Sequence, residues 1–364
     1  MSLQFNNNLK LFITTNLDLD GNINTTGFNA DNTKQLVPTK GSFRMEQSRS
    51  YSYVDNSNLI DTTTSLNATA KASLSLGSVG FSTLLNSSPL GPSDLWLWNY
   101  LVSEEDYPNS RWSSSPGAQT FNLARTSNNL ASFGLIAVSG TTTYLLSGVR
   151  VSSVNLSINT SELISVEWSL NFTGIMVLND SVSLNQTKIN EYSFTGGLIG
   201  TAEKLILDIY KYSVGKFIRT TLLSPAGVSL GSLATISGNM SVTNSLSYAD
   251  SEGMEVSQFT KLFAGAGEEA VTGSLSFYTR STSGTLRTLI EELAKIQSDP
   301  YTYSSYGLKL EFMGFNSSST LIEITLIPCN ITYSTSFDSA ITNTINYKLV
   351  YSSLNNIYSI KFYT

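Results

Sequence analysis

The best match to a catalytic motif in this chain is a Gly-x-Ser-x-Gly pattern formed by Gly227, Ser229 and Gly231. In hydrolases this pattern makes a sharp strand-to-helix turn whose serine is activated by a histidine base. The chain contains no histidine, which removes Ser-His-Asp and Cys-His catalysis, histidine-ligated zinc and the commonest general base at neutral pH. The residues that follow, Ala234–Gly238, are interpreted as a strand and a turn, so we interpret the match as a coincidence in a chain rich in Ser and Gly.

Two further patterns are incomplete versions of known sites. Ser213–Lys216 resembles a Ser-x-x-Lys pair, but its usual partner motifs do not occur, and Tyr210 stands where a phosphate-binding loop needs glycine. Asp18–Asn22 resembles the start of a calcium loop, but its glycine comes at position 4, and Asn29 stands where such a loop needs glutamate. We predict a hairpin turn for the first pattern. For the second we predict a turn at the end of the first strand, with an adventitious cation as the alternative.

Adjacent carboxylates could suggest the paired acids of a glycosidase. The pairs are Glu104–Glu105, Glu268–Glu269 and Glu291–Glu292. Neighbours in sequence diverge on a helix or loop, so we interpret these pairs as solvated surface. The sequence therefore predicts a protein that is not an enzyme, with no catalytic residue, no cofactor and no metal site.

The composition indicates a β-rich chain whose surface meets other proteins. Charged residues make up 13% of the 364 residues, about half the usual share, while there are 18 Tyr and 17 Phe. Strands favour aromatic residues, and the cores of interfaces combine few charges with many aromatics. Codon bias in a low-GC genome is an alternative cause of the same composition.

Several classes of protein are disfavoured by the charge and by the distribution of apolar residues. The net charge is −6 without a Lys/Arg cluster, so we expect no surface that binds nucleic acid through its phosphates. We expect no transmembrane helix and no secretory signal, since no apolar run reaches about 18 residues and the first residues lack a basic and an apolar region. The lone Cys329 cannot form an intramolecular disulfide, which suits a reducing compartment.

Alternation of apolar and polar residues predicts a long hairpin in the first half of the chain. Its strands are Val151–Ile158 and Val166–Phe172, preceded by a strand over Thr143–Ser147. One face of the second strand is expected to be buried and carries Val166, Trp168, Leu170 and Phe172. The same pattern recurs about 175 residues later, over Thr320–Pro328, Asn330–Ser334 and Asn343–Tyr351, and a last strand is expected at Ile357–Phe362.

Two helices are predicted, one before each of these strand groups. Ser93–Val102 begins with a capping serine and an acidic residue, and Leu286–Ile296 has apolar residues at helical spacing. Each helix follows a short expected strand, Ala72–Leu76 or Val271–Thr279. Because strand, helix, strand pair and hairpin occur twice in this order, we interpret the chain as a duplication with halves 1–187 and 188–364.

Two long polar stretches, Asn22–Asn67 and Ser224–Ala270, precede the helices. Structureless loops of this length are uncommon in compact domains unless they are functional. We expect extended arms or hairpins that contact neighbouring subunits.

Several segments, taken in order along most of the chain, resemble the tail tube protein of the T-five group of siphophages. They are Met1–Gln4, Pro38–Arg44, Ser93–Trp98, Val151–Ser169, Ser237–Tyr248, and Thr272–Tyr278 with the helix that follows it. The resemblance rests on this collinear order, since none of the segments is a specific motif by itself. The last expected strand is Ile357–Phe362, so we expect no extra immunoglobulin-like domain of the kind that some relatives carry.

The resemblance implies an all-β fold with minor α content: two tandem tail-tube-type β-sandwich domains, each flanked by one α-helix. Three chains would form a ring of pseudo-sixfold symmetry, with the sheets of all subunits joined into one inner β-barrel. Stacked rings would form a hollow tube in the phage tail, through which double-stranded DNA passes without specific binding. The implied partners are further copies of the chain and the tape measure, baseplate and terminator proteins. The protein would be made in the host cytoplasm and reside in the virion, with no membrane association.

In such a tube the polar residues of the first hairpin would face an acidic or neutral bore. These residues are Ser153, Asn155, Ser157, Glu167, Ser169 and Asn171. The strands Ile331–Ser334 and Ile345–Tyr351 would line the bore in the same way. A ring-stacking arm would include Tyr51, Tyr53, Asp55 and Asn58. The alternatives are a non-polymerising tail or baseplate protein, such as a hub or terminator, and a surface binding module of the adhesin or lectin type.

Overall fold

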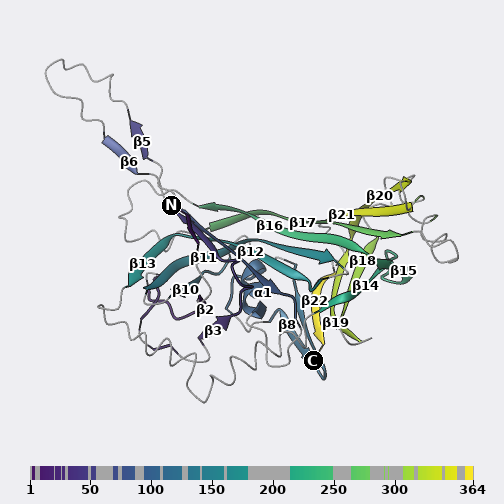
Figure 1. Cartoon of the computed structure of the whole chain (residues 1–364), viewed down its shortest axis with the longest axis horizontal. Coiled ribbons are helices and arrows are strands. Elements are labelled where there is room, and N and C mark those ends of the chain that lie inside the picture. The colour runs from purple at the N-terminus through teal and green to yellow at the C-terminus, as the bar shows by residue number, and fades with distance from the viewer. Residues whose placement is uncertain are drawn as a thin grey trace.

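In its described residues the structure, a computed structural model, consists mainly of β-strands with one continuous α-helix, so the fold is all-β with minor α content (Figure 1). It describes residues 2–4, 9–19, 21–25, 27–28, 32–47, 51–54, 69–72, 76–86, 94–106, 110–124, 130–139, 142–159, 162–178, 214–248, 264–278, 291, 294, 306–314, 319–337, 341–350 and 357–363. The strands form a 13-stranded sheet, a 7-stranded sheet and a 2-stranded hairpin.

The 13-stranded sheet has one long path and one branch. The path runs β1 (Ser2–Gln4), β4 (Arg44–Gln47), β7 (Gly77–Leu84), β12 (Ser165–Phe172), β11 (Thr142–Asn159), β16 (Ser237–Tyr248), β17 (Ala264–Tyr278), β21 (Ile341–Leu349), β20 (Cys329–Phe337). The branch consists of β13 (Gly174–Leu178), β10 (Phe133–Ser139), β2 (Lys10–Thr14) and β3 (Thr33–Leu36), and joins the path at β11.

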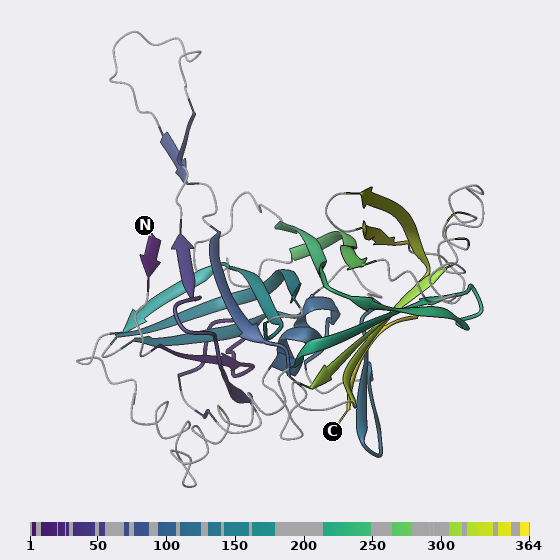
Figure 2. The same ribbon diagram turned by 45° about the vertical axis from the view of Figure 1, so that its right-hand side comes forward.

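The 7-stranded sheet runs β15 (Ser229–Thr235), β14 (Val214–Leu223), β18 (Gly307–Gly314), β19 (Thr320–Ile327), β22 (Ile357–Tyr363), β9 (Ala118–Asn122), β8 (Trp112–Ser115). The separate hairpin consists of β5 (Tyr51–Val54) and β6 (Thr69–Ala72). It stands away from the body of the molecule in two views (Figures 1 and 2).

The predicted hairpin of the first half is confirmed as β11 and β12. Its expected buried face is confirmed as well, because the four apolar residues of β12 are at most 1% exposed: Val166, Trp168, Leu170 and Phe172. The strands predicted at Thr143–Ser147 and Val151–Ile158 are a single strand, β11. It bends at Gly148, which has a φ of 64° that favours glycine. Up to Val149 β11 pairs with β10 and β13, and from Arg150 onward it pairs with β12 and β16, so this strand connects two layers.

The strand pairings repeat along the chain. In residues 10–178, here called the N-terminal repeat, β2 pairs with β3 and β10, β10 pairs with β11, β11 pairs with β13 and β12, and β12–β7–β4 follow in order. In residues 214–363, the C-terminal repeat, β14 pairs with β15 and β18, β18 with β19, β19 with β22, and β20–β21–β17–β16 follow in order. Each pair of the first repeat has a counterpart in the second, with β19 and β20 together in the place of β11.

The helix α1 (Asp94–Val102) is enclosed by the core rather than lying outside it, and every one of its residues is buried. Trp98 packs edge-to-face on Trp168 of β12, with ring centroids 5.1 Å apart, and Tyr100 contacts Phe133 of β10. A helix that is apolar on all sides needs such enclosure. Of the second predicted helix, Leu286–Ile296, the structure describes Glu291 and Ala294, which are helical.

The two repeats join at two seams. One is the pairing of β11 with β16, and the other is the pairing of β9 with β22, which places the β8–β9 hairpin of the N-terminal repeat on the sheet of the C-terminal repeat (Figure 2). At the second seam Trp112 stacks on Phe121 with ring centroids 4.4 Å apart, and it also faces Phe362 of β22. The repeats therefore share their sheets rather than touching across a linker.

Two of the predicted segments differ from the structure. In Ser224–Ala270 the described residues, 224–248 and 264–270, do not form an extended arm, because β15, β16 and the first part of β17 belong to the sheets, with β16 as a central strand that forms a hairpin with β17. Its hydroxyl-rich residues alternate with apolar ones, which suits a strand with one buried face. Of the strand expected at Ala72–Leu76, Ala72 is the last residue of β6 and Leu76 precedes β7, while residues 73–75 lie outside the described residues.

A buried amide adds a polar link to the first seam. Asn244 of β16 is 4% exposed, and its Nδ2 donates to the backbone carbonyls of Leu101 in α1 (2.7 Å) and Val151 in β11 (3.2 Å). The Leu101 carbonyl belongs to the last turn of α1, where backbone acceptors lack helical partners.

The variant Asn244→Leu is therefore expected to lower the free energy of unfolding by about 2 kcal/mol, because it leaves buried carbonyls without a donor. Chemical denaturation followed by tryptophan fluorescence measures the change. Ser245→Ala, at the adjacent exposed position of the same strand, is the control and is expected to shift the free energy by less than about 0.5 kcal/mol. Equal effects of the two substitutions would contradict the role assigned to the Asn244 amide.

Candidate functional surface

The polar residues predicted for the first hairpin lie together on one face of the 13-stranded sheet. Ser153 pairs with Ser169, and Asn155 pairs with Glu167, while Asn171 follows Ser169 at the two-residue spacing of a strand face. Ser157 lies on the same side of β11 as Asn155. The structure thus brings all six predicted residues onto the side of the sheet opposite the buried core. We call this side the polar face.

The polar face continues across the first seam into the C-terminal repeat. Asn155 pairs with Ser241 of β16, which pairs with Thr272 of β17, which in turn pairs with Lys348 of β21. A parallel row leads from Ser157 through Asn239, Ser274 and Asn346 to Thr332. Asn239 Oδ1 accepts hydrogen bonds from the backbone nitrogen and the Oγ of Ser274, at 2.8 Å and 3.0 Å, so neighbouring strands are also linked through side chains. One surface of hydroxyls and amides therefore spans both repeats.

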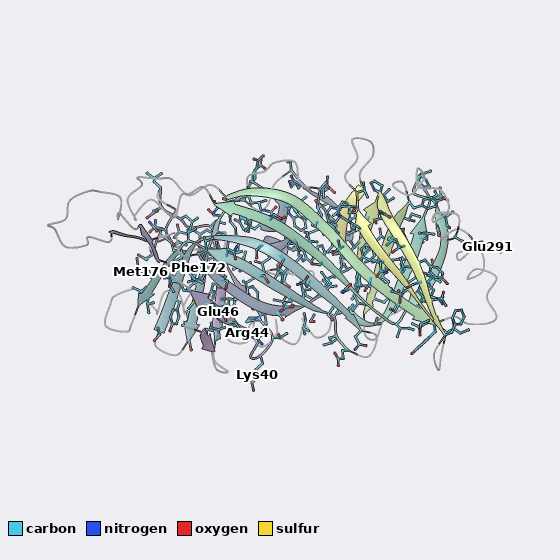
Figure 3. The ribbon with its side chains drawn as sticks, turned by 90° about the horizontal axis from the view of Figure 1, so that it is seen from above. Lys40, Arg44, Glu46, Phe172, Met176 and Glu291 are labelled. Atoms are coloured by element: carbon cyan, nitrogen blue, oxygen red, sulfur yellow. The ribbon has the colours of Figure 1, made fainter. Side chains whose placement is uncertain are left out.

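Charges on the polar face are few and mixed. Among its described side chains, the exposed charged ones are Arg44 and Glu46 on β4, Glu167 on β12 and Lys348 on β21. Arg44 and Glu46 lie near one end of the sheet (Figure 3), and β7, β12, β11, β16 and β17 separate β4 from β21. Binding to DNA phosphates requires a row of Lys and Arg, which this part of the surface does not provide.

The predicted ring-stacking arm coincides in part with the β5–β6 hairpin. Tyr51 and Tyr53 belong to β5 and pair with Ala72 and Ala70 of β6. Asp55 and Asn58 lie outside the described residues. Figures 1 and 2 show β5 and β6 projecting from the end of the molecule where β1 and β4 lie.

A cluster of charges on the 7-stranded sheet was not predicted from the sequence. Arg219 of β14 donates from Nε and an Nη to the two carboxylate oxygens of Glu311 of β18, both at 2.8 Å. Lys309 Nζ lies 3.6 Å from Glu311 Oε1 and 3.7 Å from Glu323 Oε2 of β19. These residues come from distant parts of the chain, so only the period-two placement of Lys309 and Glu311 could have indicated a charged strand face.

This cluster opens onto a cavity of about 460 Å³ that Arg219, Lys309 and Glu311 help to line. Burial alone would raise the pKa of Glu311, but the Arg219 hydrogen bond and the nearby Lys309 outweigh burial, so that pKa lies below its usual value. An ionised and fully paired carboxylate cannot serve as a general acid at neutral pH. The cluster is therefore an ion-pair network on a sheet face.

The other candidate chemical residues are placed in turns, strands or the core. Ser229 begins β15 after a turn in which Gly227 has a φ of 74°. Of the strand and turn predicted over Ala234–Gly238, the strand is confirmed at the end of β15, while the turn is wrong, because β16 begins at Ser237. The hairpin turn predicted at Ser213–Lys216 is wrong, because β14 begins at Val214. The turn at Asp18–Asn22 is confirmed, since the Asn22 amide donates to Asp18 Oδ1 at 2.9 Å.

Acidic and sulfur-containing side chains form no reactive centre in the described part of the chain. Glu104 and Glu105 are exposed, as is Glu291. Burial raises the pKa of the Cys329 thiol to about 12, so it remains protonated and inert at neutral pH. The described residues contain no group of three or more potential metal ligands, and none of their helices has the length and apolar character needed to cross a membrane.

Comparison with known proteins finds neither a matching family model nor a matching curated protein. Among solved structures, a chain in the baseplate of the anti-feeding prophage is similar at 12% identity and a TM-score of 0.29, covering 37% of this chain and 89% of that one. A chain in the tube-terminating cap of the same prophage is similar at 11% identity and a TM-score of 0.29, covering 40% of this chain and 88% of that one. Similarity at this level does not establish a fold or a function.

Proposed function

We propose that the chain is a structural protein of a phage tail, the major subunit of the tail tube, with tandem tube domains over residues 1–187 and 188–364. The observation that carries this proposal is the polar face, which runs without interruption through two repeats of matching strand order. A self-assembling wall needs such a surface and needs no catalytic residue. The collinear resemblance of the sequence to siphophage tube proteins supports the same assignment.

The first seam provides a template for how copies join. Inside the chain, β11 of one repeat pairs with β16 of the other. In a ring, β20 and β4 are the counterparts of these strands: β20 lies at one end of the path, and β4 lies at the other end beneath the three-residue strand β1. Joining β20 of one copy to β4 of the next continues the sheet, and three copies with two repeats each close it into a barrel of pseudo-sixfold symmetry. Closure removes exposed strand edges that would otherwise pair without control.

In this arrangement the polar face lines the bore. Hydroxyls and amides such as those of Ser153 and Asn155 form hydrogen bonds with water, and mixed charges provide no continuous attraction for phosphate. The tube is then a conduit through which DNA moves without binding. The tape measure, baseplate and terminator proteins are the expected further partners at the tube ends and in the bore.

Electron microscopy of the purified full chain tests the assignment directly. Indefinite tubes with a central channel are the expected result. Closed single rings or monomers would favour a hub or terminator that does not polymerise. A monomer that binds cell surfaces or sugars would favour a surface binding module instead.

Removing Asn56–Thr69, the segment that follows β5 and ends with the first residue of β6, is expected to leave a folded protein that no longer forms tubes. The reason is that β5 and β6 project from the body of the molecule (Figures 1 and 2), where Tyr51, Tyr53, Asp55 and Asn58 would contact an adjacent ring. Negative-stain microscopy and circular dichroism measure assembly and folding. Tubes of normal length from this variant would rule out the stacking role.

Adding positive charge to the polar face is expected to make the tube bind DNA. In the triple variant Ser153→Arg, Asn155→Arg, Ser157→Arg, three contacted phosphates would weaken binding roughly 500-fold for each tenfold rise in salt. A DNA-binding titration at several salt concentrations measures this slope on assembled tubes. The triple glutamine variant adds similar bulk without charge and should resemble the wild type. If tubes of the arginine variant bind DNA no better than wild-type tubes, these residues do not face the bore.

A further inference from the structure

The long path of the 13-stranded sheet has two different outer edges. At one end β20 pairs with β21 and has no partner on its other side among the described residues. The nine residues Cys329–Phe337 contain no charge and no proline, and Phe337 is 77% exposed. Natural edge strands are usually protected by charges, proline or a covering segment. The edge of β20 therefore has the properties of a strand that pairs with a partner.

The opposite edge is covered by the chain itself. The strand β4 pairs with β7 on one side, while its other side pairs with β1. The register of this outer pairing is Ser2↔Glu46, Leu3↔Met45 and Gln4↔Arg44, and it is antiparallel. Figure 2 shows β1 beside β4 at the end of the sheet. A strand edge can pair with one strand at a time, so β1 closes this edge to any other strand.

The repeated strand order indicates which strand would otherwise pair there. In the N-terminal repeat β4 is the last strand after β7, as β16 is the last strand after β17 in the C-terminal repeat. The free side of β16 pairs antiparallel with β11, whose counterpart in the other repeat is β20. Thus β1 occupies on β4 the position that β11 occupies on β16, and it runs in the same direction.

We propose that β1 is a displaceable strand that covers the outer edge of β4 in the free subunit, and that β20 of a second copy replaces it during assembly. This inference rests on the proposed function, since it concerns how rings close. The exchange is favourable because β20, with nine residues, is long enough to pair along the whole of β4 (Arg44–Gln47), whereas β1 forms three pairs with it. Covering the edge in the meantime prevents uncontrolled pairing of free subunits.

A reversible disulfide between β1 and β4 tests the exchange in the full chain. The pair Ser2→Cys/Glu46→Cys joins directly opposite residues, and the single native cysteine, Cys329, is fully buried. We expect the oxidised variant to remain a monomer and to form tubes at the wild-type rate after reduction. The control pair Ser113→Cys/Thr120→Cys crosses the β8–β9 hairpin away from this edge, and its oxidised form should assemble like the wild type.

A second variant lacks residues 2–8 and leaves β4 uncovered. It is expected to assemble at least about tenfold faster, or at a correspondingly lower critical concentration, as measured by light scattering. If the oxidised Ser2→Cys/Glu46→Cys variant forms tubes as fast as its reduced form, the displacement of β1 is wrong while the tube function stands. If the shortened chain folds but forms no tubes, β1 is a permanent part of the wall and the inference is also wrong. If the wild type forms no tubes under any condition, the proposed function fails and this inference fails with it.

Discussion

Trp168→Ala is expected to lower the free energy of unfolding by about 4 kcal/mol. The indole of Trp168 is fully buried on β12, where it packs edge-to-face on Trp98 of α1 with an interplanar angle of 75°. Its Nε1 donates to Thr83 Oγ1 of β7 at 3.1 Å. The substitution removes apolar contact with the enclosed helix, opens a cavity and leaves a buried hydroxyl without its donor.

Chemical denaturation of the purified variant measures this loss, and Trp168→Phe separates its causes. Phenylalanine keeps an aromatic ring in the core but has no N–H, so we expect it to cost about 1–2 kcal/mol. If phenylalanine were as damaging as alanine, the hydrogen bond to Thr83 rather than ring packing would be the larger contribution. If neither substitution lowered stability by more than about 1 kcal/mol, the enclosed position of α1 would be wrong.

Asp94→Asn is expected to remove a pH dependence from the stability of the protein. Burial raises the pKa of Asp94 to about 7, and a hydrogen bond from Thr83 only partly opposes this shift. In the unfolded chain the carboxyl ionises near its ordinary pKa of 3.8. Between these two values the folded state binds more protons than the unfolded state, so the free energy of unfolding falls as the pH rises from about 4 to about 7.

The expected loss is about 4 kcal/mol across this range, because each unit of pKa difference between the folded and unfolded states corresponds to about 1.4 kcal/mol. The free energy of unfolding of the wild type and of Asp94→Asn is measured at pH 5, 6, 7 and 8. The value for the variant minus the value for the wild type is expected to increase with pH. The exposed Glu104→Gln is the control and should follow the wild type. A difference between Asp94→Asn and wild type that stays constant with pH would contradict the buried, protonated state of Asp94.

The local elements of this protein could be predicted from short stretches of sequence. Val166, Trp168, Leu170 and Phe172 alternate with polar residues, and this spacing requires a strand with one buried face whatever its partners are. The helix was predictable from local sequence as well, because the capping Ser93 and the acidic Asp94 mark its start. The repeated order of these elements likewise predicted two halves. The strand pairings of the N-terminal repeat match those of the C-terminal repeat.

Pairings between distant segments could not be predicted in this way. The sequence of Ser237–Tyr248 alternates like many other stretches here, so its own pattern indicates a strand but not which edge it joins. In the structure this segment is β16, a central strand and not an arm. It takes this place because the backbone groups on the second side of β11 need a partner strand. The Arg219–Glu311 ion pair has the same origin, because residues 92 positions apart become neighbours only when β14 and β18 pair.

The sequence by itself therefore determined the β-rich character, the residues of the polar face and the absence of histidine chemistry, because each depends on residue type or on spacing within one strand. The tertiary structure alone decided the two seams between the repeats, the enclosure of α1 and the pairing of β1 with the outer edge of β4. Backbone hydrogen-bonding groups are identical at every strand edge, so the choice of neighbour depends on how the whole sheet closes. For a protein proposed to act by joining copies of itself, these edges are the part of the molecule on which assembly depends.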